Sequence, residues 1–582
     1  MTGDGQRSRL VVLLAVASIV VGVVAVPAIA TAGTTGTLSI AVNTTLDGDH
    51  VGNIVIAADN VTLDCADHTI TSTDVGSGTG IRLLNRSGVT IRNCQVEDFF
   101  NGIGFFNSSG NTVIGNTAHN NVEGIQLADG SNSNTITSNE TTNSGDCGFS
   151  IEFSSNNTLE SNNAVGSHGF CLNHGHRNTL EGNTAQDNGT GIGLESSTRN
   201  ILTENAVNGS DFFGIGLFDS SRNTLNGNTS DSNEVGFWLA DGSSKNKLRG
   251  NTASHNSGGF LLQASASNNK LYGNSTNDNS EFGFNLEGSA NTLRNNSSVS
   301  DGETGFFVRG ESATNNRLVR NTATDALNGF SVNDASGNTL KRNTSVNNGV
   351  GFAVVGPSAT ANTLIRNWAS GNFADDDDFT GFFLADGASG NTLEHNTSSG
   401  FNDGFHLTSS SGNMLEGNTS FDNNSGFVFR GAFDNYVERN TATDNNSGFF
   451  VADASYGNTF ERNRASTNRY QGFVIMDASS NNALNRNQAR LNETGFHLRS
   501  GSSDNTFTGN SSKKNLANGF ETDPDSGGDN SFTRNKANKN GGVGITDWTS
   551  DSGTADTANF YTNNVCLRNV SGQSDPLGLC LP

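Results

Sequence analysis

The sequence predicts an all-β protein: a right-handed parallel β-helix of about twenty stacked coils, each of 22 to 25 residues and three short strands. Three observations predict this fold. A pair of asparagines recurs at nearly constant spacing, a Gly followed by Phe or Ile recurs with it, and only 33% of the residues are hydrophobic. A compact globule with so little apolar material would struggle to offset its chain entropy.

The asparagine pair has the form N-x4-N and first occurs at Asn111/Asn116. It continues without interruption to Asn530/Asn535, giving nineteen copies, mostly 21 to 25 residues apart. Each copy offers three segments of three to five residues separated by Asn, Gly and Ser. Such segments are too short for useful helices but suit strands whose side chains alternate between interior and solvent.

The Gly-Phe element places aromatic residues at one position of the coil. It runs from Gly124-Ile125 to Gly544-Ile545, with Phe after the Gly in fifteen coils and Ile in four. We expect equivalent residues to stack in ladders, with Phe inside and Asn hydrogen-bonded from coil to coil at the turns. The Gly is expected to provide an unusual turn dihedral. The resulting rod would be on the order of 100 Å long.

Composition narrows the possible partners. The net charge is −24, and Lys accounts for few of the 33 basic residues. Such a surface repels nucleic acid, whose binding depends on cationic contacts, so no nucleic-acid partner is expected. An acid-rich, lysine-poor surface also fits a high-salt habitat, where screening removes the self-repulsion.

The ends of the chain predict export. Arg7 and Arg9 precede an apolar run and a small-residue stretch that suits signal-peptidase cleavage, so residues 1–32 are expected to be a signal peptide. A retained membrane anchor is the alternative; no later segment is long and apolar enough to span a membrane. Residues 33–547 then form the β-helix, with its N-terminal cap, and 548–582 a C-terminal cap. The protein would be secreted or at the cell surface.

Six cysteines, an even number, fit an oxidising compartment. Cys566 and Cys580 close a short loop and are expected to form a disulfide. Cys65 and Cys94 fall at similar places in neighbouring coils and are a second candidate pair.

The early coils, with Val61-Thr62-Leu63-Asp64-Cys65 and Val89-Thr90-Ile91-Arg92-Asn93-Cys94, resemble right-handed β-helix proteins of the pectate-lyase-like superfamily. The following Asn-Thr-Leu and Gly-Phe coils resemble the NosD type, named for a periplasmic accessory protein of nitrous oxide reductase. The resemblance, from about residue 36 to 547, implies the fold. Its motifs are structural and are shared by carbohydrate lyases, hydrolases, epimerases and copper-maturation factors.

One local cluster combines cysteine and histidine. Its members are Cys147, His168, Cys171, His174 and His176. Aligning Gly148 with Gly169 places Cys147 beside His168 on adjacent coils. Sulfur and imidazole ligands suit copper or zinc, and the NosD resemblance favours copper. Alternatives are a Cys147–Cys171 disulfide, geometrically awkward for repeat positions three apart, or two unbonded thiols.

Two acidic segments are candidate cation sites. Three acids, Asp523, Asp525 and Asp529, occur in one short segment with two glycines and loosely suggest a calcium loop. An acidic run, Phe373 to Phe379, interrupts the longest coil and could bind a cation or a sugar, or be a solvated insertion.

Three functional hypotheses follow. The leading one is a non-catalytic rod that binds polysaccharide or a cell-surface glycan, because acidic residues are scattered over turns rather than grouped as a catalytic cluster. The second is an enzyme on acidic polysaccharide: a lyase, hydrolase or epimerase. The third is a copper-binding accessory protein of the NosD type.

Overall fold

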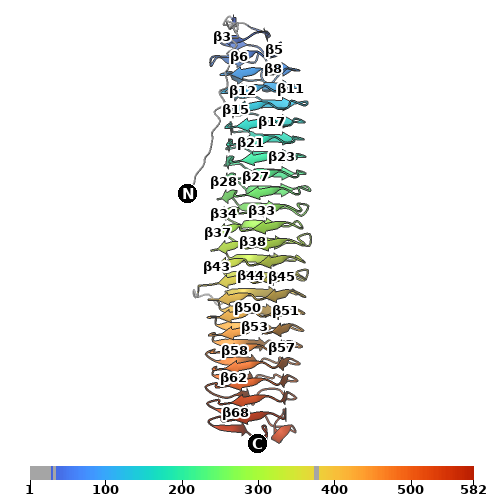
Figure 1. Ribbon diagram of the computed structural model, residues 1–582, viewed down its shortest axis with the longest axis vertical. Helices are drawn as coiled ribbons and strands as arrows, with labels where there is room; N and C mark the ends of the chain where they lie inside the picture. The colour runs from blue at the N-terminus through green and yellow to red at the C-terminus, as the bar shows by residue number, and fades with distance from the viewer. Residues whose placement is uncertain (1–27, 31–34, 373–378, 582) are drawn as a thin grey trace, which may run out of the picture.

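The computed structural model describes residues 28–30, 35–372 and 379–581. They form a single straight rod in which the chain winds from one end to the other without doubling back (Figure 1). The rod has about 22 coils, and their strands form three parallel sheets, two of which contain 24 and 23 strands. This architecture confirms the predicted parallel β-helix. We call them sheets A, B and C. Among the described residues no helix is long and apolar enough to cross a bilayer.

A central coil shows the arrangement. Sheet C contributes β41 (Asn328–Asn333), sheet A β42 (Thr339–Lys341) and sheet B β43 (Thr344–Val346). Each strand pairs in register with its equivalent one coil on, as Leu340 does with Leu364. The corners are made by single left-handed residues, such as Arg342 (φ 55°) between sheets A and B. The strands of sheet C are the longest, mostly five or six residues, so its outer face is the widest.

The interior ladder of Phe side chains is confirmed. Stacked rings run without a break from Phe237 to Phe520, with neighbouring centroids 4.5 to 4.8 Å apart. Phe330, near the middle, is fully buried. Each ring therefore packs on the coil above and the coil below, and removes apolar area from water at both contacts.

The asparagine ladders are also confirmed. The backbone N–H of Asn321 and its side-chain amide both donate to Oδ1 of Asn343, at 2.9 and 3.1 Å. The same amide donates to the carbonyl of Leu293 at 3.1 Å. Each buried amide thus has partners on both neighbouring coils, as buried polar groups require.

A third polar ladder was missed by the sequence prediction. It lies at the corner after sheet B, where Asn233, Asn256 and Asn279 bond in series and end on Asp301. Ser and Ala interrupt it in other coils, which hides its period. It too closes a corner through coil-to-coil hydrogen bonds.

The role predicted for the repeated Gly is wrong. These glycines have ordinary φ values; what excludes a side chain is the next coil. A Cβ at Gly426 would lie 2.5 Å from the carbonyl oxygen of Gly448, and one at Gly381 would lie 2.7 Å from that of Gly404. The Gly is therefore required for close approach of adjacent backbones.

The ends differ in detail from the prediction. Ala28–Ala30 of the expected signal segment form β1, which pairs with β3 (Thr44–Leu46); the rest of residues 1–32 lies outside the described residues. At the other end β69 (Phe560–Thr562), β70 (Val565–Leu567) and β71 (Gly572–Asp575) make one more coil within the expected cap. Asn559 and Asn564 are its asparagine pair.

Two of the disulfides lie near these ends. Cys65–Cys94 and Cys566–Cys580 are both formed, as the sequence predicted.

Candidate functional site

Cys147 and Cys171 form a third disulfide. The register places Cys147 opposite His168, as aligned from the sequence, but passes over Gly148 and Gly169. This break in the alternation puts residues three apart on the same outer face of sheet C, so the expectation of an awkward bridge was wrong. Among the described residues no cysteine is free. The thiolate ligands of the predicted copper site are therefore not available.

The three histidines of that cluster have separate contacts. His168 Nδ1 lies 3.3 Å from Asp146, the His174 ring stacks on Phe153, and His176 Nδ1 lies 3.1 Å from the Thr198 hydroxyl. Within the described ranges, none of them belongs to a group of three side chains close enough to share a metal ion. The structure does not assemble the predicted site.

The predicted calcium loop is dispersed as well. Asp525 accepts a hydrogen bond from the backbone of Ser500, and Asp529 lies at a left-handed turn. Asp523 instead joins His497 on β62 (Thr494–Leu498) and Glu521 on β65 (Phe520–Thr522), with His497 Nε2 2.9 Å from its Oδ1. Residues 373 to 378 of the predicted acidic run lie outside the residues that the structure describes.

The His497–Glu521–Asp523 group is a compact set of possible ligands: its ligand atoms lie within 4.8 Å of one another. Nδ1 of His497 is buried without a hydrogen-bond partner. An imidazole with two carboxylates is a donor set for Zn²⁺ or Cu²⁺, whereas Cu⁺ prefers thiolate or thioether sulfur.

A pocket of about 240 Å³ lies on the outer face of sheet C, over the disulfide. It crosses β14 (Glu123–Ala128), β17 (Cys147–Glu152), β20 (His168–Asn173), β23 (Thr190–Glu195) and β26 (Phe213–Phe218). We call it the sheet C pocket. Its lining combines four carboxyl groups, from Glu123, Asp146, Glu152 and Glu195, with the rings of Phe213 and Phe218.

Glu123 is the buried acid of this pocket. The pKa of its carboxyl group is raised from 4.5 to about 7, chiefly by burial; a hydrogen bond with Ser150 opposes this rise, and the charges of Glu152 and Asp146 contribute to it. Its Oε2 atom is buried and has no hydrogen-bond partner. Glu123 therefore keeps its proton to a higher pH than an ordinary glutamate, and a strongly raised pKa in a pocket is a pattern characteristic of functional sites.

The aromatic side of the pocket is made possible by glycine. At Gly216 a Cβ would lie 2.7 Å from the rings of both Phe213 and Phe218, so only Gly lets these rings cover the strand. Trp238, one coil on, meets both rings edge-on with centroids 6.0 and 5.5 Å away. The result is an apolar wall beside an acidic floor. Sequence reasoning missed these rings, because they occupy outward positions that have no repeat.

The three parallel sheets and the pocket on the outer face of one of them define a parallel β-helix protein with an outward-facing site. A family described as periplasmic copper-binding protein (NosD) matches residues 42–212, 163–282 and 377–540, and one described as right handed beta helix region matches 248–374. The chain belongs to the NosD family, as its repeats indicated. No protein with a curated description matches it.

Several solved structures are similar at low identity. The catalytic domain of a GH87 alpha-1,3-glucanase in complex with nigerose is 16% identical over 46% of this chain and 61% of its own, with a TM-score of 0.34. The periplasmic alginate epimerase AlgG is 12% identical over 63% and 77%, with a TM-score of 0.34. A rhamnogalacturonan lyase is 12% identical over 48% and 77%, with a TM-score of 0.25. At these values the likeness concerns the type of fold.

Proposed function

We propose that this protein is an extracytoplasmic rod that binds polysaccharide and that the sheet C pocket holds sugar residues. The observation that carries the proposal is the pairing of carboxyl groups with aromatic rings in one outward pocket. Carboxylates accept hydrogen bonds from sugar hydroxyls, while the C–H face of a pyranose packs on an aromatic ring.

The compartment fits this role. Three disulfides hold the described part of the chain, and disulfides persist in oxidising compartments outside the cytosol. Polysaccharides are available there as ligands, and a rod that carries a pocket on its side can contact a long polymer.

Calorimetric titration with a panel of oligosaccharides tests the proposal. We expect Phe218→Ala to weaken binding of the selected oligosaccharide by about tenfold, which corresponds to the loss of one ring contact of about 1.4 kcal/mol. Phe450→Ala is the matched control, because Phe450 lies on the same outer face but outside the pocket. Equal affinity of wild type and Phe218→Ala would contradict the assignment of the pocket.

One observation favours a second candidate, hydrolysis of the bound glycan. A glycosidase needs a protonated carboxyl to donate to the leaving oxygen and an ionised one nearby, and Glu123 beside Glu152 and Asp146 meets that electrostatic requirement. In this proposal Glu123 is the acid. Release of reducing ends by the wild type, and its loss in Glu123→Gln with binding retained, would support it. No release from any bound oligosaccharide would leave the binding role alone.

A further inference from the structure

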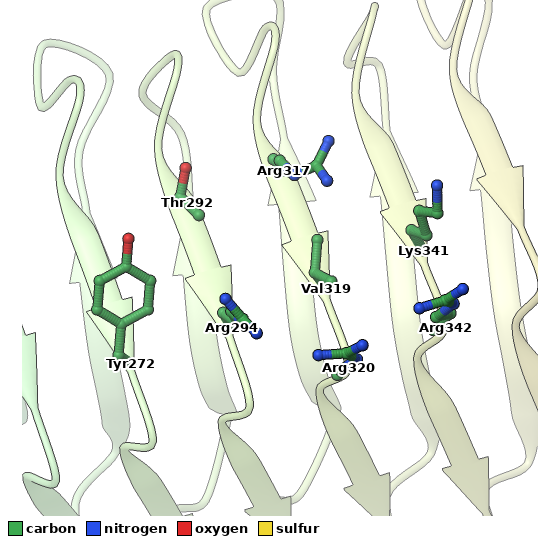
Figure 2. A pocket seen from close by; sticks show the side chains of 8 residues that line it. All are labelled: Tyr272, Thr292, Arg294, Arg317, Val319, Arg320, Lys341 and Arg342. Carbon is green, nitrogen blue, oxygen red and sulfur yellow. The ribbon is translucent and has the colours of Figure 1, made fainter.

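A second hollow, of about 350 Å³, lies on the outer face of sheet A and is lined by cations. It crosses β33 (Lys270–Tyr272), β36 (Thr292–Arg294), β39 (Arg317–Val319) and β42. We call its charged lining the basic ladder: Arg294, Arg317, Arg320, Lys341 and Arg342. Figure 2 shows these side chains standing on three neighbouring coils, with the Tyr272 ring at one end.

The register explains the alignment. The last residues of successive sheet A strands pair in order, Tyr272 with Arg294, Arg294 with Val319 and Val319 with Lys341. Arg320 and Arg342 follow at the corner of their coils. Consecutive coils lie about 4.8 Å apart, so the ladder presents its positive charges in steps of that size along the rod.

The corner arginines are placed at a conformational cost. Arg320 and Arg342 have φ values of 56° and 55°, in the left-handed region. The same corner is Gly in two earlier coils, at Gly250 and Gly273. A left-handed backbone is strained for a residue that carries a side chain, so a corner that accepts Gly has no structural need for Arg.

The basic ladder lacks acidic partners. In the described part of the chain none of its five members forms an ion pair, although the chain carries a net charge of −24. Arginines at the equivalent corner further along are paired: Arg439 with Glu416 and Glu438, and Arg462 with Glu438 and Glu461. These glutamates are the last residues of their sheet A strands. In the coils of the basic ladder the same strand position is occupied by Arg294, Val319 and Lys341. The sequence therefore supplies neutralising acids in one part of the face and omits them in another.

We propose that the basic ladder is a binding site for a carboxylated polysaccharide that lies along the rod axis across sheet A. Guanidinium groups bind carboxylates with two parallel hydrogen bonds, and a polyuronate carries one carboxylate on each sugar. Tyr272 supplies a ring for a sugar face at the end of the row. The guanidinium of Arg249 lies 5.6 Å from the centre of that ring and extends the positive surface by one coil.

A polysaccharide fits better than a nucleic acid. Double-stranded DNA carries one charge per about 1.7 Å, so most of its phosphates would face the surrounding acidic surface rather than the ladder. A uronate chain is charged more sparsely, on the scale of the coil spacing. The site lies on another sheet than the sheet C pocket, and it takes a ligand of defined charge.

Titration of the full chain with polygalacturonate tests this site. We expect affinity to fall steeply with added salt, and to fall about tenfold or more in Arg320→Gln/Arg342→Gln, because two charge-assisted contacts are lost. The control is Arg439→Gln/Arg462→Gln, which changes the same corner where the arginines are already paired; it should stay within about twofold of wild type. Carboxyl-reduced polygalacturonate should not bind.

Unchanged affinity of Arg320→Gln/Arg342→Gln, or equal loss in the control variant, would overturn the proposal. Tighter binding of a DNA oligonucleotide than of polygalacturonate would overturn it as well. Phe218→Ala probes the sheet C pocket and should leave polygalacturonate binding at the basic ladder unchanged. Failure at one site is therefore distinguishable from failure at the other.

Discussion

Cys147 and Cys171 are joined by a disulfide across adjacent coils of sheet C, although the residue directly opposite Cys147 is His168. The bond is possible because Gly148 interrupts the strand alternation, so that the third residue after Cys147 again faces outward. It ties β17 to β20 beneath the sheet C pocket. A covalent crosslink thus holds the floor of the pocket, which preorganises the carboxyl groups above it.

Phe330→Ala should destabilise the protein by roughly 3–5 kcal/mol, because it leaves a ring-sized cavity between Phe306 and Phe352. The damage should stay near its own coil, since solenoid repeats contact only their neighbours. Urea unfolding measures the total, and hydrogen exchange its spread. Phe212→Ala is the control: Phe212 is 56% exposed, and its loss should cost little. A cost below about 0.5 kcal/mol at Phe330 would contradict its interior packing.

Asn321→Ala should be costly as well. It removes the acceptor for the backbone N–H of Asn296 and the donor to the carbonyl of Leu293, and each buried group left unpaired costs about 1–3 kcal/mol. Urea unfolding is again the measurement, with the half-buried Asn226→Ala as control. Equal effects of the two changes would mean that the ladder contributes nothing beyond ordinary side-chain packing.

Glu123 makes stability depend on pH. Its pKa rises from the ordinary 4.5 to about 7 on folding, so the folded state binds this proton more tightly. Its contribution is therefore largest below pH 4.5 and is lost as the pH rises to about 7; at 1.36 kcal/mol per pKa unit the loss is about 3 kcal/mol. The free energy of unfolding is measured at pH 5 and at pH 8 for the wild type and for Glu123→Gln. The variant should lack this part of the pH dependence. Glu160→Gln, on an exposed position of sheet A, should not.

Metal binding is expected at His497 rather than at Cys147. Titration with Cu²⁺ or Zn²⁺ should show affinity that falls by about tenfold or more in His497→Ala, because the imidazole is the sole nitrogen ligand of the group. Cys147→Ser/His168→Ala should bind as wild type does, because the disulfide already occupies the sulfur. Weaker metal binding by Cys147→Ser/His168→Ala, with unchanged binding by His497→Ala, would contradict this expectation and support the site predicted from the sequence.

The fold could be predicted because its determinants repeat. Residues equivalent to Phe330, Asn321 and Asn343 recur in most coils at nearly constant spacing, and a periodic solenoid converts sequence spacing directly into contact. Sites do not repeat. Glu123 lies on β14, whereas Phe213 and Phe218 lie on β26, and Gly216 leaves room for the two rings over that strand. The basic ladder was missed as well, because the significance of Arg294 and Arg320 depends on the absence of acidic partners in their part of sheet A.

The asparagine bonds also give the rod a direction. The backbone N–H of each ladder Asn donates to the Asn one coil further on, so every coil is completed by the coil that follows it in the chain. If the rod winds from its N-terminus, the ladder N–H groups of the newest coil lack their acceptors until the next coil forms. Asn559, in the final turn, instead donates its amide to the side chain of Asp547. That carboxylate ends the series, and a chain truncated before residue 559 would expose a row of donors at its growing tip.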